Sequence, residues 1–220
     1  MSAVQLQQHL ANAVSDGLHH PMVTRLSRLG GSPQDCHAGL MNLLRECRIL
    51  DMIEPVPDAP SMQIILPSTL IQTIHRHYPQ MFTARFGADR RSLRKFWRGF
   101  LSDAVRRDWA SEHPCLRGQS AAMLETAIPL TVHEDAGPVT KAQGVVCLSF
   151  SALLGTGGEK VSKFLCSSWI KTERGTDAGP NAVWRRIIRD FDDLVSGKVG
   201  GEPVARDDDG TEWRFILLFA

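Results

Sequence analysis

The chain has 220 residues, of which 43% are hydrophobic and 22% charged, and its formal net charge is +1 at pH 7. This composition is typical of a globular protein with one large domain or two small ones, and a charge so close to zero gives no global argument for nucleic-acid binding. No stretch approaches the roughly 18 uninterrupted apolar residues of a membrane span, and no basic stretch precedes an apolar block at the N-terminus. We therefore expect neither membrane insertion nor secretion.

The five cysteines are odd in number and widely spaced, and no two of them form a C-x-x-C pair. A disulfide framework or a zinc site would need cysteines at recognisable short spacings. The pattern instead favours reduced, mostly buried thiols. It predicts an intracellular protein, nuclear or cytoplasmic.

Residues 1–126 are expected to form a mainly helical region. The segment 32–35 (Ser-Pro-Gln-Asp) offers an N-cap, a first-turn proline and a first-turn acid, which together predict the start of a helix. Three prolines between residues 55 and 60 predict an extended loop after it. A further helix is expected from Pro67 to about Tyr78.

The clearest helix is expected over residues 89–111, where apolar residues recur at three- and four-residue steps. Residues 85–126 carry nine Lys and Arg against five Asp and Glu, so the positive charge of the chain is concentrated here. Such a basic face is either the solvated side of a helix that packs against the core, or a surface that meets phosphates. The candidate nucleic-acid-binding residues are Arg90, Arg91, Arg94, Lys95, Arg98, Arg106 and Arg107.

From residue 127 the pattern changes to strand-like apolar runs, which predicts a second region over 127–220. Its expected elements are strands over 128–135, 144–149 and 163–170, a helix over 179–196 and a last strand over 213–219. The order is therefore strand, strand, strand, helix, strand. Together with the helical first region, it predicts an α+β fold.

Two adjacent acids, Glu134 and Asp135, end the first of these strands. Because neighbours on a strand point to opposite faces, only one of them can enter any one site. Asp135 is the candidate metal-binding and catalytic acid, with Glu134 beside it. The alternative is a turn-forming aspartate that binds nearby backbone N–H groups.

Several known motifs are absent from the sequence. The glycine-rich segment 155–160 lacks the Gly-Lys-Ser/Thr ending of a phosphate loop, and the acidic run 207–210 lacks the alternating ligands of a calcium loop. His133-Glu134 has no second histidine at metalloprotease spacing. A flexible connection and a solvated turn explain the first two segments more simply.

Four segments, 65–68, 128–139, 146–151 and 213–220, carry a resemblance to a known family. From His20 to Phe219 the chain resembles a family of uncharacterised repeated proteins of dinoflagellate genomes, which is similar to transposases with an RNase H-like core. The resemblance implies a mobile-element protein that binds DNA. It also implies a core of three antiparallel strands, a helix and a fourth strand, the order predicted above for residues 127–220.

In that core the first metal-binding acid comes from the first strand, which the resemblance assigns to Asp135, and the second from the end of the fourth strand, where this sequence has none. Two-metal phosphodiester chemistry needs several carboxylates to hold both ions. The resemblance therefore implies a truncated, partial RNase H-like unit without catalytic activity. Asp135 would be the remnant of a divalent-metal site.

Three functions remain open. The first is a transposase-derived fragment that is not an enzyme and binds nucleic acid weakly through the basic helix. The second is a non-catalytic protein-interaction module, in which the last apolar strand offers an open sheet edge for self-association or a partner. The third is a metal-dependent phosphoesterase or nuclease that uses Asp135 and an ion such as Mg²⁺, completed by Asp190, Asp192 or Asp193.

Overall fold

A computed structural model describes residues 21–28, 32–46, 48–138, 144–156, 163–171 and 178–219, together with residues 4, 7, 8, 11 and 15. Helices and sheets are both present, so the α+β class is confirmed. The chain divides into two compact units, Met1–Ile53 and Glu54–Ala220. Most of residues 1–20, and positions 157–160 of the glycine-rich segment, lie outside the described residues.

The first unit contains helices α2 (Pro21–Ser27) and α3 (Pro33–Glu46), followed by the short helix η1 (Leu50–Met52). The predicted start of α3 is confirmed, because the Asp35 backbone N–H donates a 3.1 Å hydrogen bond to the Ser32 hydroxyl. Cys36 and Leu43 are buried on one side of this helix. None of the described helices of the chain is long and apolar enough to cross a membrane.

A two-stranded sheet takes the place of the loop expected at residues 55–60. It pairs β1 (Ile53–Val56) with β2 (Ala59–Ile65). Each strand contains a proline, at positions 55 and 60. In a two-stranded sheet every strand has a free edge, so the missing proline N–H can face away from the pairing.

The main sheet has four strands in the order β5-β4-β3-β8. Its elements are β3 (Ala127–Pro138), β4 (Gly144–Ala152), β5 (Phe164–Lys171), α10 (Ala178–Ser196) and β8 (Arg214–Phe219), with the small hairpin β6 (Lys198–Val199) and β7 (Glu202–Pro203) before β8. The pairs β3–β4 and β4–β5 are antiparallel, whereas β3 and β8 are parallel. Three strands, a helix and a final strand thus follow one another as predicted.

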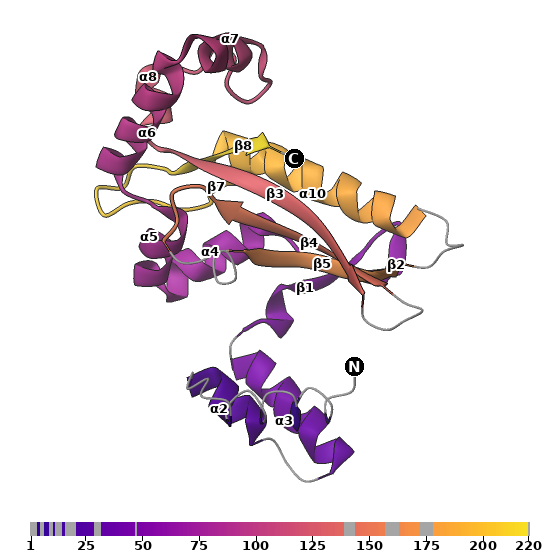
Figure 1. The fold of residues 1–220 in the computed structure, drawn as a ribbon. Coiled ribbons are helices and arrows are strands. Elements are labelled where there is room, and N and C mark those ends of the chain that lie inside the picture. Colours follow the sequence, from indigo (N-terminus) through magenta and orange to yellow (C-terminus); the bar gives the residue numbers. More distant parts are fainter. Residues whose placement is uncertain are drawn as a thin grey trace. The chain divides into compact units, whose positions relative to one another are not determined.

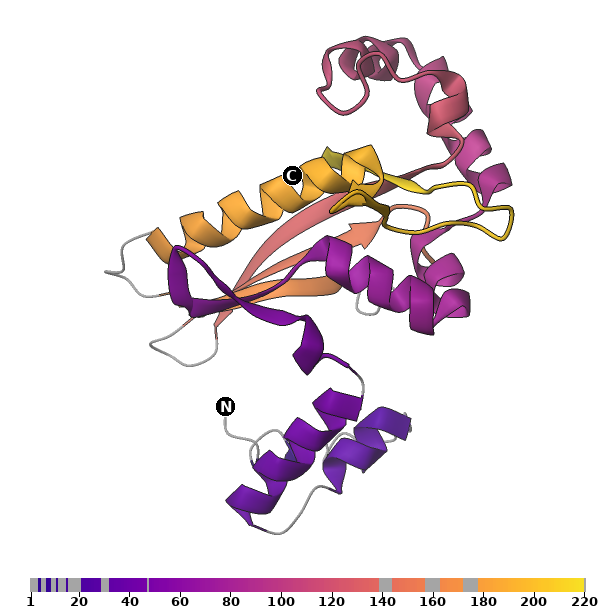
Figure 2. The same ribbon diagram turned by 180° about the vertical axis from the view of Figure 1, so that it is seen from behind.

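One face of the sheet packs against helices and holds much of the core. Phe150 of β4 contacts Phe191 of α10 edge-on, at 6.3 Å between ring centroids, and Phe86, the last residue of α5 (Pro79–Phe86), at 6.4 Å. Helix α10 lies behind the sheet in Figure 1 and in front of it in Figure 2, which is the same scene from behind. Helices α4 (Pro67–His77) and α5 (Pro79–Phe86) complete this layer.

The opposite face of the sheet is more polar and more exposed. Residues opposite one another in the β3–β4 register share a face, so Thr131, His133 and Asp135 lie with Ser151, Ser149 and Cys147. On β5, Leu165 and Ile170 are about half exposed (48% and 49%). Strand β8 is hydrogen-bonded to β3 alone among the described strands, so it forms an edge of the sheet.

The compact units do not follow the expected division at residues 126 and 127. Ile71, Phe86 and Leu93 share one hydrophobic core with Leu130 and Leu148 of the sheet. Residues 54–126 therefore fold together with 127–220, because their apolar faces cover the sheet. The boundary lies at residues 53 and 54 instead.

The single helix expected over 89–111 is wrong, because two helices occupy this segment. They are α6 (Arg90–Ser102) and α7 (Ala104–Glu112), and α8 (Ala121–Leu124) follows. Asp103 has extended backbone angles and accepts a 2.9 Å hydrogen bond from the Arg106 N–H, so it caps α7. The apolar pattern ran through this break, yet Val105 is 77% exposed.

Candidate nucleic-acid interface

Helix α6 is fixed at its start by a cap and along its length by an apolar stripe. The Asp89 carboxylate accepts a 2.8 Å hydrogen bond from the Ser92 backbone N–H, and hydrogen bonds from Ser92 hold the pKa of Asp89 below its usual range. Leu93, Trp97 and Phe100 are buried on one side. The Trp97 indole N–H donates a 2.8 Å hydrogen bond to the Ala127 carbonyl at the start of β3.

The opposite side of α6 is cationic. Successive residues of a helix are rotated by about 100°, so residues 91, 94, 95 and 98 fall on the face opposite the buried stripe. All four side chains, Arg91, Arg94, Lys95 and Arg98, belong to exposed residues. Helix α6 therefore packs against the core on one side and exposes cations on the other, which fits both alternatives that the sequence left open, a solvated face and a face that meets phosphates.

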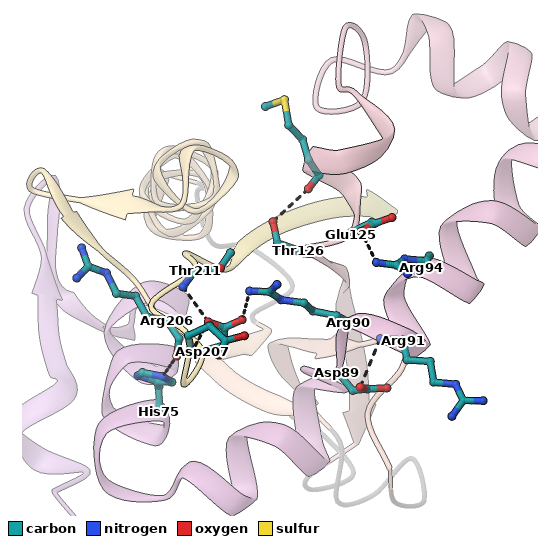
Figure 3. A network of polar contacts seen from close by, with 12 residues as sticks. His75, Asp89, Arg90, Arg91, Arg94, Glu125, Thr126, Arg206, Asp207 and Thr211 are labelled. Carbon is teal, nitrogen blue, oxygen red and sulfur yellow. Dashed lines mark hydrogen bonds and ion pairs between the residues drawn. The ribbon is translucent and has the colours of Figure 1, made fainter.

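Arg90, the first predicted cation, does not point to solvent. Its guanidinium forms an ion pair with Asp207, in the loop before β8, and Figure 3 shows Arg90 turned toward that loop and Arg91 turned away from it. Asp207 also accepts a 2.8 Å hydrogen bond from the Thr211 N–H. Burial raises the pKa of Asp207, but this hydrogen bond and Arg90 outweigh burial, so the pKa lies below its usual range. Arg90 is a structural residue that ties α6 to this turn.

Arg94 is partly neutralised by Glu125. Their side chains form a 2.7 Å ion pair between α6 and the residue after α8, drawn in Figure 3. The hydrogen bond from Arg94 lowers the pKa of Glu125, and the charges of Arg94, Arg98 and Arg90 lower it further. The carboxylate thus lies at the edge of the cationic face.

The two cations predicted beyond residue 103 lie on α7 and not on α6. The Arg106 guanidinium lies over the Phe100 ring, 5.7 Å from its centroid, in a cation–π contact. Arg107 is exposed. Of the seven predicted residues, Arg91, Lys95 and Arg98 remain as exposed α6 cations that have no ion-pair partner within the part of the chain the structure describes.

Two apolar pockets flank the cationic face of α6. One has a volume of about 340 Å³, and Trp97, Leu101 and Leu124 line it. The other has a volume of about 520 Å³, and Phe96 and Phe100 line it. Both volumes are within the usual range of pockets for small ligands. The pockets could not be predicted from the sequence, because the residues that close them, on α8 and at Leu154 just after β4, are distant in sequence from α6.

Glu134 and Asp135 lie apart, as strand alternation predicted. The Trp184 indole N–H on α10 donates a 2.8 Å hydrogen bond to Glu134. Asp135, on the other face, forms a 3.0 Å ion pair with Lys163, and its side chain is 66% exposed. Each carboxylate is therefore partnered by a different group, and the two do not form one site.

The acids proposed to complete a metal site with Asp135 do not do so. Asp190 is buried, where its carboxylate accepts hydrogen bonds from Ser68, and α10 lies on the face of the sheet that Asp135 does not share. Asp192 and Asp193 are exposed on the same helix. Among the described residues, no three His, Cys, Asp or Glu side chains are placed to hold a metal ion.

Comparison with known proteins gives no relative. No protein-family model, no curated protein and no solved structure matches the chain. The resemblance to transposases therefore stays a prediction. The function has to be argued from the site itself.

The structure also brings together three polar side chains that no motif in the sequence marks as a site. Thr131, His133 and Ser151 form a triangle on the exposed face of the sheet, with distances of 3.0, 3.1 and 3.0 Å between their polar atoms. A serine beside a histidine is one element of a nucleophilic site. Such a site also needs a group that orients the histidine and donors for an oxyanion. Among the described residues neither group contacts this cluster, which is best explained as polar packing of β3 on β4.

Proposed function

We propose that this protein binds nucleic acid through the exposed cations of α6. The observation that carries the proposal is that Arg91, Lys95 and Arg98 lie on one face of a well-anchored helix and form no ion pair with an acid among the described residues. Their spacing of four and three residues places them in one row along the helix. The proposal concerns the phosphate backbone, which is the common feature of all nucleic acids.

Such a row attracts phosphates although the net charge of the chain is only +1. Exposed charges farther apart than about 8–10 Å are largely screened at physiological salt, so the local surface decides the interaction and not the sum over the chain. Each neutralised phosphate releases counterions, which makes the binding salt-dependent. With three or four contacts, we expect a non-specific affinity with Kd of about 10⁻⁴ to 10⁻⁶ M at physiological salt.

The proposal fits the predicted origin in a transposase with an RNase H-like core. The strand order β5-β4-β3-β8 and the parallel pairing of β3 with β8 support that origin. We propose that the chain derives from a mobile element and acts by binding. The proposed contacts need no divalent metal, because the cations of α6 themselves neutralise the phosphates.

The test is fluorescence anisotropy of a labelled DNA duplex at 50 mM salt, with EDTA present. The triple variant R91Q/K95Q/R98Q should bind at least about tenfold more weakly than the wild type. The matched control is R76Q/R185Q/R189Q, which removes three exposed cations from α4 and α10. Equal losses in both variants would mean that overall charge and not α6 is responsible, and undiminished binding of the first variant would contradict the proposal.

A second candidate function is protein interaction through the edge strand β8. Its outer edge has no strand partner among the described residues, and its sequence is Arg-Phe-Ile-Leu-Leu-Phe. An unpaired edge of this kind can add a strand from a second chain. Sedimentation velocity over a range of concentrations tests it. A monomer at all concentrations excludes self-association through this edge.

A further inference from the structure

We infer that the α6 surface binds a single strand of nucleic acid, with unstacked bases entering the two pockets beside the cation row. This inference rests on the proposed function and narrows its substrate class. Helix α6 combines a row of cations with two apolar pockets. A row of cations alone would bind a duplex and a single strand equally well. Pockets with apolar and aromatic walls serve only a strand whose bases are free.

The first pocket lies between α6 and α8. Trp97, Leu101 and Leu124 provide apolar surface, and Arg94 and Arg98 line the same pocket. The Trp97 ring is held in place by its hydrogen bond to the Ala127 carbonyl, so this wall is preorganised. Guanidinium groups stack on base faces as well as binding phosphate, so both arginines can serve either part of a nucleotide.

The second pocket lies on the other side of α6. Phe96 and Phe100 line it, with ring centroids 5.8 Å apart, and so does Lys95 of the cation row. Arg106 of α7 also lines it and lies over the Phe100 ring. This pocket therefore repeats the combination of the first one, apolar walls beside cations.

The helical geometry places the cation row between the pockets. At about 100° per residue, positions 94, 97 and 101 lie on one side of residues 91, 95 and 98, and positions 92, 96 and 99 lie on the other. A backbone that follows the row would therefore have a pocket within reach on either side. In a duplex the bases are paired inside the stack, so only the phosphates would be bound.

The experiment compares a 12-nucleotide labelled single strand with the duplex of the same sequence, in DNA and in RNA, at 50 mM salt. The wild type should bind the single strand about tenfold or more tightly than the duplex, because each stacked base contributes to affinity. Ala121→Leu should fill the first pocket without changing charge and should lower single-strand affinity several-fold, with duplex affinity unchanged. The matched control is Ala122→Leu, which changes an exposed neighbour that does not line the pocket.

Gly99→Leu gives an independent test of the second pocket, because Gly99 lines it and a side chain there meets no atom within 4 Å at its Cβ. Thermal unfolding checks that both variants are folded. The inference is supported if the wild type prefers the single strand to the duplex, in DNA or in RNA, and if this preference falls in Ala121→Leu and in Gly99→Leu but not in Ala122→Leu. Equal binding of single strand and duplex, or a preference that survives both pocket variants, overturns it and leaves the proposed function standing. Absence of any binding overturns both.

Discussion

Asp190 of α10 accepts two hydrogen bonds from Ser68 of α4, which is 122 residues earlier in the chain. The Ser68 backbone N–H donates at 2.8 Å and its hydroxyl at 2.5 Å. Both residues are 1% exposed. The carboxylate therefore satisfies a free N–H in the first turn of α4, which no local side chain caps. It fixes α4 to α10 on the covered face of the sheet.

Removing this carboxylate should destabilise the fold strongly. Asp190→Ala leaves a buried N–H and a buried hydroxyl without their partner, and we expect the free energy of unfolding to fall by about 3 kcal/mol. Ser68→Ala keeps the backbone hydrogen bond and should cost only about 1–2 kcal/mol. Urea denaturation measures both. Asp192→Ala, on the exposed side of α10, is the control and should change stability by less than about 0.5 kcal/mol.

The same carboxyl makes stability depend on pH. Burial raises the pKa of Asp190 above its ordinary value of 3.8, although the hydrogen bonds from Ser68 oppose the shift. Because its pKa is raised, the Asp190 carboxyl binds a proton more tightly in the folded state than in the unfolded chain. The stabilisation that comes from this proton is fully present below about pH 3.8 and is lost as the pH rises through the raised pKa. Relative to Asp190→Asn, which does not titrate, the wild type should gain stability as pH falls from 7 to 4. A difference that is constant with pH would contradict this assignment.

Two glycines give a contrasting pair of stability predictions. A Cβ on Gly155 would lie 2.0 Å from the Arg85 carbonyl oxygen, whereas a Cβ on Gly99 would meet nothing within 4 Å. Gly155→Ala must therefore push the segment that follows β4 away from α5, and we expect the free energy of unfolding to fall by about 2–3 kcal/mol or more. Gly99→Ala, in an exposed helix interior, should gain about 0.5–1 kcal/mol. Thermal unfolding of the two variants checks the opposite signs.

Much of the second half of the fold could be predicted from the sequence, because each element has its own local signal. In that half, the apolar run of β3 and helix α10 lie close to their predicted positions, and in the first half the proline-initiated helices α3 and α4 do so too. The division of the chain could not be predicted, because the partners of the apolar faces of α4 to α6 are set by tertiary packing. The break between α6 and α7 could not be predicted from the apolar spacing, because Asp103 caps α7 inside a continuous apolar period.

In the candidate site, too, contacts between residues that are distant in sequence could not be predicted. The cations of α6 could be found from local composition, but their partners could not. Asp207 is 117 residues from Arg90 and Glu125 is 31 residues from Arg94, so only the fold separates paired arginines from exposed ones. Strand alternation correctly separated Glu134 from Asp135. It could not reveal that Lys163 is the partner of Asp135.

Glu125 should weaken binding in the wild type, because it neutralises Arg94 at the edge of the cationic face. In Glu125→Gln, Arg94 becomes available to phosphate, and we expect affinity for nucleic acid at 50 mM salt to rise about two- to fivefold. Anisotropy titration measures the change. Glu202→Gln, an exposed acid on β7, removes the same charge and should have little effect. A similar rise in both variants would assign the effect to net charge alone.

The most direct test of nucleic-acid binding by α6 is the salt dependence of the affinity. The logarithm of the binding constant, plotted against the logarithm of the salt concentration, should have a slope that falls in magnitude by about one for each phosphate contact removed. We predict a slope shallower by about three in R91Q/K95Q/R98Q and an unchanged slope in R76Q/R185Q/R189Q. The same slope in the wild type and the α6 variant, or no measurable binding by the wild type at 50 mM salt, would contradict the account.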